Sequence, residues 1–199
     1  TLPDFMVHEV ESIWNEYETF NNIRVLDVGA DLAYFKHLKL LSNELGGVLS
    51  QVIVAMIDFY NIITVKRGLS QNKSHGDILQ LLSDEGSISA KEFIYIVENQ
   101  EIFVWFNKIN PSLDSIFSTY ELKMQDATIS SSELEFLCDL LLYKTLDQGR
   151  YNVDGPLVLA RYLLGCEFEV KNLRMIISAL QNTIPFESIK ERIRPHYGS

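Results

Sequence analysis

The fold is decided by one stretch of sequence, EFEVKNLRMIISALQNTIPFESIKERIR at residues 167–194, because a weaker copy of it lies earlier in the chain. Aligned without a gap, residues 58–82 and 169–193 share an acid with an Asn three positions later, then apolar residues at helical spacing, then a second short amphipathic segment. Asn61 and Asn172 form one of three identical pairs. We call the separation between positions 58 and 169 the repeat offset. It is much longer than the period of solenoid repeats, so it predicts two successive helical domains of similar design.

The composition limits the possible class of protein. A chain of 199 residues can bury a sizeable core, and its hydrophobic fraction of 47% with 22% charged residues is typical of an ordinary globular protein. The net charge of -10 argues against a nucleic-acid partner, because such a surface needs clustered positive charge. We expect partners that present positive groups, since complementary potentials steer encounter.

Neither the apolar runs nor the cysteines predict an unusual environment. The longest uncharged run, residues 45–57, has 13 residues, fewer than the roughly 18–20 of a spanning helix, so no transmembrane helix is expected. Thr1 in place of a start Met suggests part of a longer chain. Cys138 and Cys166 stand in apolar surroundings and are expected to be reduced core thiols.

Apolar spacing and terminal signals predict helices along the whole chain. The first three are expected over about residues 4–19, from residue 26 to the Gly46-Gly47 pair, and over about 48–67, where Gly68 should take a left-handed cap conformation. Ser74 is a predicted N-cap, and capping boxes are expected at Ser89–Glu92 and Ser130–Glu133. Residues 101–107 favour a packed helix, residues 156–180 a long one, and Pro185 opens the last helix.

The chain is therefore predicted to be all-α, with two tandem helical-bundle domains. Asn110-Pro111 marks a break, which places the boundary within residues 100–112. We assign residues 1–106 to the first repeat domain and residues 107–199 to the second.

No catalytic, cofactor-binding or metal-binding motif is found in the sequence. The four histidines lie in different segments, and no phosphate loop, nucleophile elbow or paired-cysteine motif is present. The doubled acid-x-x-Asn unit is the polar feature that stands out. On a helix, Asp58 with Asn61 and Glu169 with Asn172 share a face, so each pair can bond internally or clamp a neighbouring helix end. Its recurrence favours a structural clamp over catalysis.

The repeated stretch resembles a known family. Residues 167–174, Ile176-Ile177 and residues 184–192 look like the C-terminal end of the C subunit of bacterial and archaeal V/A-type rotary ATPases, whose eukaryotic counterpart is the d subunit. Residues 31–35 and 57–62 look like their equivalents in that family's middle domain. The family's acid, Asn and apolar-or-Arg stretch fall on Glu169, Asn172, Leu173 and Arg174.

The resemblance implies a mechanical role in the transport of protons or sodium ions. Members of the family are all-helical funnels of three similar domains, which cap the membrane rotor ring on its cytoplasmic side and receive the lower end of the central shaft. They are non-catalytic and transmit torque, so the implied partners are the central-shaft subunits (D and F type) and the rotor ring. Attachment to the membrane would be peripheral, and no cofactor is implied. The chain would then be the last two domains, with a third acid-x-x-Asn helix expected one repeat offset before Asp58.

Two other interpretations stay open at this point. The chain could be a generic helical adaptor unrelated to rotary motors, which would not bind shaft or ring subunits. It could also be a helical enzyme with a dispersed site, in which case the acid/Asn pairs would be the candidates. Replacing Asp58 and Glu169 by amides would abolish turnover in an enzyme, whereas a clamp would mainly lose stability, about 1–3 kcal/mol for a buried group left unpaired.

Overall fold

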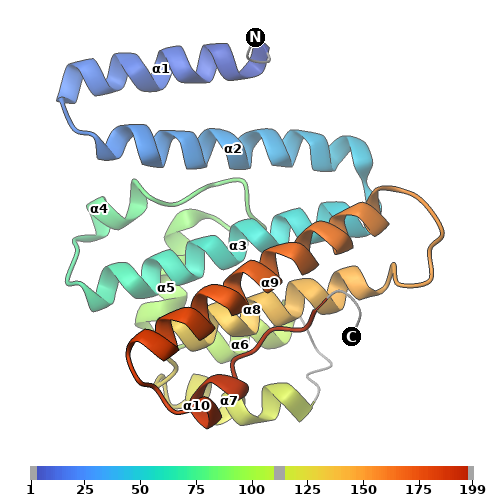
Figure 1. Cartoon of the computed structure of the whole chain (residues 1–199). Coiled ribbons are helices and arrows are strands. Elements are labelled where there is room, and N and C mark those ends of the chain that lie inside the picture. Colours follow the sequence, from blue (N-terminus) through green and yellow to red (C-terminus); the bar gives the residue numbers. More distant parts are fainter. Residues whose placement is uncertain (1–3, 110–114, 197–199) are drawn as a thin grey trace.

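The structure of the chain is a computed structural model that describes residues 4–109 and 115–196. This part is all-helical, which confirms the predicted fold class (Figure 1). Asn110-Pro111, at which the sequence predicts a break, lies outside the described residues. The helices are α1 (Asp4–Phe20), α2 (Arg24–Leu45), α3 (Gly47–Ser70), α4 (His75–Leu79), α5 (Ala90–Glu98), α6 (Ile102–Ile109), α7 (Ser115–Gln125), α8 (Ser131–Asp147), α9 (Pro156–Gln181) and α10 (Phe186–Lys190).

The helices form successive layers around α3. Helix α1 packs on α2 and α2 packs on α3, as the upper half of Figure 1 shows. On its other side α3 packs against α8, and α9 in turn packs on α8. The short helices α4 and α10 follow the two long helices α3 and α9, and each packs back on the helix that precedes it.

One continuous hydrophobic core holds both repeats together. It contains residues of α3, α5, α6 and α8, so it crosses the predicted boundary between residues 106 and 107. Phe59 of α3 lies against Trp105 and Phe106 of α6, with ring centroids 6.1 and 6.0 Å apart. The division into domains 1–106 and 107–199 stays a prediction, and any two such domains share their core.

Helix α3 is long and apolar enough to span a membrane if only length and composition are considered. Half of its most apolar window is buried inside the protein, as in the central helix of a bundle. The uncharged run in the sequence stops at Asp58, but this carboxylate is 2% exposed and hydrogen-bonded within the protein. We therefore interpret α3 as the core helix of the fold.

Local signals placed most helix ends correctly. Ser74 caps α4 by accepting a hydrogen bond from the Asp77 N–H at 3.2 Å, and capping boxes are present at Ser89 and Ser130. The cap predicted at Gly68 is wrong. Gly68 is buried inside α3, which continues to Ser70, and Asn72 takes the left-handed conformation instead with φ 56°.

Close packing explains the glycine at position 68. A Cβ there would lie 2.7 Å from Ile78 Cγ1, so the missing side chain lets α4 approach α3. At the other end of α3, Gly46 and Gly47 have φ of 62° and 57°, which produces the predicted break between α2 and α3.

Candidate functional site: two asparagine clamps and an ion-pair cluster

The first acid-x-x-Asn unit holds the segment that follows α4. The buried Asn61 side chain donates from Nδ2 to the Ser83 carbonyl at 2.8 Å, and its Oδ1 accepts from the Ser83 N–H at 2.9 Å. The Asn61 amide thus satisfies both the N–H and the C=O of Ser83, which is itself only 4% exposed. Tyr60 adds a hydrogen bond from its hydroxyl to the Leu81 carbonyl at 3.0 Å.

Asp58 binds a residue slightly farther along the same segment. Its carboxylate accepts from the Ser87 N–H at 2.8 Å and from the Ser87 hydroxyl at 2.6 Å. Burial raises the pKa of Asp58, and the two hydrogen bonds from Ser87 oppose that shift. Gly86 gives the carboxylate room, since a Cβ there would lie 2.3 Å from Asp58 Oδ1.

The second unit repeats the asparagine contact in the same register. Asn172 donates from Nδ2 to the Arg194 carbonyl at 2.9 Å and accepts from the Arg194 N–H at 2.9 Å. Both asparagines bind the residue 22 positions later. A shift by the repeat offset places the last residue of α3 on that of α9, and α4 directly on α10.

The acids of the two units do not behave alike. Glu169 is exposed and makes no hydrogen bond or ion pair with the part of the chain that the structure describes. The counterpart of Ser87 is Gly198, which lies outside that part. Arg174, which the resemblance singles out, is also exposed on α9.

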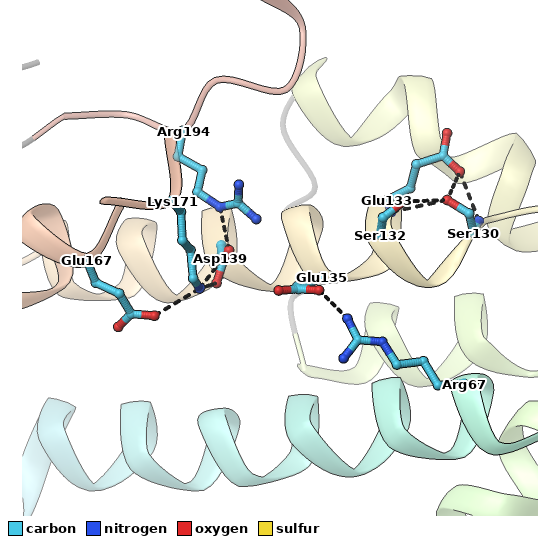
Figure 2. A network of polar contacts seen from close by, with 9 residues as sticks. All are labelled: Arg67, Ser130, Ser132, Glu133, Glu135, Asp139, Glu167, Lys171 and Arg194. Carbon is cyan, nitrogen blue, oxygen red and sulfur yellow. Dashed lines mark hydrogen bonds and ion pairs between the residues drawn. The ribbon is translucent and has the colours of Figure 1, made fainter. Parts of the chain in front are cut away.

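An ion-pair cluster centred on Asp139 fastens the second unit instead (Figure 2). Asp139 of α8 accepts from Lys171 Nζ at 3.0 and 3.2 Å and from Arg194 Nε at 2.5 Å. Lys171 also pairs with Glu167 at 2.9 Å. Burial acts against the charge of Lys171, but its two carboxylate partners raise its pKa overall. The cluster ties α8, α9 and the C-terminal segment together.

Two more ionic contacts join neighbouring elements. Arg161 of α9 is 7% exposed and donates from Nε to Asp147 of α8 at 2.9 Å. Arg67 of α3 pairs with Glu135 of α8 at the surface, and Figure 2 shows this contact between the two repeats. Because Arg67 is exposed and Glu135 is only partly buried, their pair contributes little stability.

None of these ionic contacts was predicted from the sequence, neither the Asp139 cluster nor the pairs made by Arg161 and Arg67. A usable signal was the acid at position 139 inside the apolar stripe of α8, because a buried carboxylate needs cationic partners.

The two cysteines are free, but only Cys138 is a core residue, and Cys166 is half-buried on α9. Burial raises the pKa of the Cys138 thiol well above its usual value, so it is a poor nucleophile.

These polar groups can hold backbone segments, but they leave little capacity for chemistry on a substrate. The side-chain amides of Asn61 and Asn172 bind the backbone of Ser83 and of Arg194, and the carboxylate of Asp58 binds Ser87. Within residues 4–109 and 115–196, no three His, Cys, Asp or Glu side chains gather as a metal site would require.

Comparison with known proteins finds relatives of this chain. A family model described as "ATP synthase (C/AC39) subunit" matches residues 6–192. The C subunit of the V-type sodium ATPase of Enterococcus hirae is 28% identical over 197 residues, which are 98% of this chain and 59% of that protein. The chain thus spans less than two thirds of the length of this curated relative. No solved structure matches the chain significantly.

Proposed function

The chain belongs to the ATP synthase (C/AC39) subunit family, and from this premise we propose that it is a non-catalytic rotor subunit of a V/A-type ATPase. It would sit on the cytoplasmic face of the membrane and couple the central shaft to the membrane rotor ring. Torque would pass through it between the ATP-hydrolysing head and the ion-carrying ring. Its attachment to the membrane would be peripheral, through the ring.

The observation that carries this proposal is the continuous core shared by both repeats. Helix α3 packs on α8 through that core, so a force applied to one repeat passes to the other directly through packed side chains. The asparagine clamps and the Asp139 cluster fasten the segments that leave α4 and α10. A torque adaptor needs this stiffness, because a compliant element would store the rotation instead of passing it on.

The polar residues support a mechanical role over the enzyme alternative. The acid/Asn pairs were its candidate catalytic groups, but Asp58 and Asn61 bind Ser87 and Ser83, and Glu169 lies by itself on an exposed face. A general acid and base would instead converge on a shared cleft.

Binding to purified motor parts tests the proposal. We expect the protein to bind both the isolated central-shaft heterodimer and the detergent-solubilised rotor ring. We expect no nucleotide binding by the protein in either complex. Because the chain carries a net charge of -10, the shaft contact should weaken about tenfold between 50 and 500 mM salt. Loss of binding to both parts at low salt would favour the generic adaptor.

Reconstitution gives the functional readout. Complexes assembled without this subunit should retain ATP hydrolysis by the head but lose ATP-driven ion transport, and added protein should restore transport. Asp58→Asn and Glu169→Gln should leave restored transport intact at temperatures where the variants are folded. Abolished activity in a folded Glu169→Gln variant that still binds the shaft and the ring would point to catalysis, because Glu169 is exposed and makes no hydrogen bond or ion pair with the described residues.

A further inference from the structure

An open groove lies between the first half of α2 and the short helix α4 in the first repeat. Its volume is about 740 Å³, within the range of roughly 300–1,000 Å³ that is typical of small-molecule sites. On the α2 side it is lined by an apolar row, Val25, Val28 and Leu32, and Leu81 lines it from the turn after α4. The apolar row is about 10 Å long, at about 1.5 Å per helical residue. The groove therefore offers an elongated apolar surface with room for a small molecule.

Two cations line the same groove without an anionic partner. Arg24 stands next to the first residue of the apolar row, and Lys73 comes from the segment between α3 and α4. Neither side chain forms an ion pair or a hydrogen bond with the rest of the described chain, although Glu16 and Asp77 also line the groove. Asp77 instead accepts from the Ser74 hydroxyl at 2.6 Å. Because Lys73 is half-buried, an anion bound in the groove would stabilise its charge.

The second repeat fills the equivalent space with its own side chains. Shifting the apolar row by the repeat offset gives Phe136, Asp139 and Tyr143 on α8. The Arg194 guanidinium carbon lies 5.7 Å from the centre of the Phe136 ring, and Arg194 Nε donates to Asp139. The Tyr143 hydroxyl donates to the His196 carbonyl at 3.2 Å. In the second repeat the segment after α10 therefore covers this row.

The first repeat has smaller side chains at the same positions. Its row consists of two valines and a leucine, and Ser83 stands where the second repeat has Arg194. Ser83 is held on α3 by the amide of Asn61 and does not reach across to α2. Compared with the second repeat, this site lacks an aromatic body and a buried carboxylate, and it keeps two cations that such a carboxylate would satisfy.

We propose that this groove binds a small anionic amphiphile, a single-chain carboxylate of the fatty-acid type. Its carboxylate would lie between Arg24 and Lys73, and its chain would follow the apolar row toward Leu32. The ligand would supply in the first repeat what Phe136 and Asp139 supply in the second, an apolar body and a negative charge. The proposal rests on the internal repeat and does not depend on the rotor role.

The size and charge of the site favour this ligand over a macromolecule. Two turns of a partner's helix form a cylinder about 10 Å wide and about 11 Å long, with a volume of about 850 Å³, which exceeds that of the whole groove. An anionic membrane surface would be repelled by a chain with a net charge of -10, whereas a single carboxylate meets only the local cations.

Direct binding of decanoate to the complete natural protein, purified without motor partners, tests the proposal by isothermal titration calorimetry. Arg24→Gln and Lys73→Gln each remove one cation of the groove, and Arg174→Gln is the matched control, an exposed cation on α9. A double variant, Val25→Phe with Leu32→Tyr, fills the groove with the residues of the second repeat. Circular dichroism verifies that each variant is folded.

We expect saturable binding of decanoate, at least tenfold tighter than binding of the uncharged 1-decanol. Arg24→Gln and Lys73→Gln should each weaken it about tenfold, Arg174→Gln should leave it unchanged, and the double variant should abolish it.

Three results would overturn the proposal. The first is no saturable binding of decanoate at about 1 mM, which corresponds to an affinity too weak for a built site. The second is equal affinity in the wild type and in both groove-cation variants, which would place the ligand elsewhere. The third is binding that depends on Arg24 to vesicles of phosphatidylglycerol but not to decanoate, which would identify a membrane surface instead. Because no motor part is present in these measurements, failure here leaves the rotor proposal standing.

Discussion

Replacing Asn61 by alanine tests whether the clamp stabilises the fold. The substitution removes two hydrogen bonds, of 2.8 and 2.9 Å, and leaves the N–H and C=O of Ser83 without partners. Ser83 is 4% exposed, so water cannot easily replace the amide. An unpaired buried polar group costs about 1–3 kcal/mol. Two such groups, with partial relaxation of the structure around them, should together lower the free energy of unfolding by about 3 kcal/mol.

Two other asparagines serve as internal comparisons. Asn172→Ala breaks the same pair of bonds, but Asn172 and Arg194 are only half-buried, so solvent can reach the freed groups and the expected loss is about 1 kcal/mol. Asn182→Ala removes one bond to the Ser178 carbonyl on an exposed helix end, with an expected loss below about 0.5 kcal/mol.

Urea unfolding followed by far-UV circular dichroism measures all three variants. The comparison is made at an unchanged slope of free energy against urea, because a changed slope would report a different unfolded state. If Asn61→Ala lost less than about 1 kcal/mol, or no more than Asn172→Ala, the bonds would not be what holds the segment after α4, and the clamp interpretation would be wrong.

Three further substitutions probe the surrounding contacts by the same unfolding assay. Gly86→Ala should cost about 1–3 kcal/mol, because its Cβ would lie 2.3 Å from Asp58 Oδ1. At Gly76 the nearest atom to an added Cβ would be Ser74 Oγ at 3.8 Å, an ordinary contact distance, so Gly76→Ala should be tolerated within about 1 kcal/mol. Asp139→Asn should lose about 2 kcal/mol, because Arg194 loses its carboxylate partner and Lys171 keeps only Glu167, and an unchanged midpoint would show that the cluster is not stabilising. Burial acts to raise the pKa of Glu133, but hydrogen bonds from a lysine and from the helix cap lower it to about 2. Its stabilisation is therefore present above pH 4.5 and lost as the pH falls toward 2, and Glu133→Gln should flatten that part of the pH profile by about 1 kcal/mol after solvent screening.

The features that could be predicted from the sequence depend on local or periodic patterns. The repeat offset placed Asn61 and Asn172 on equivalent turns of two long helices, and Ser130 with Glu133 marked the start of α8. These signals are readable because a cap or an apolar stripe involves residues within a few positions of one another.

The remaining features depend on contacts between distant segments. Gly68 has the signature of a helix cap, but its position is decided by Ile78, which needs the space of the missing Cβ. Asp139 finds its partners 32 and 55 residues away, in Lys171 and Arg194. No spacing rule links such positions, so a single sequence cannot show that this carboxylate, and not Glu169, anchors the second repeat.

The divergence of the two units follows from what each side chain can offer. An amide has both a donor and an acceptor, so Asn61 and Asn172 can each satisfy the N–H and the C=O of one backbone residue, a task that a carboxylate cannot perform alone. A carboxylate only accepts, and any acid that reaches the same donors can replace it. In the first unit Asp58 binds Ser87 of the segment after α4, whereas in the second Asp139 of α8 holds the equivalent segment after α10 through the Arg194 side chain. The asparagine therefore occupies the same position in both repeats, whereas the acid that fastens the segment lies at a different position in each.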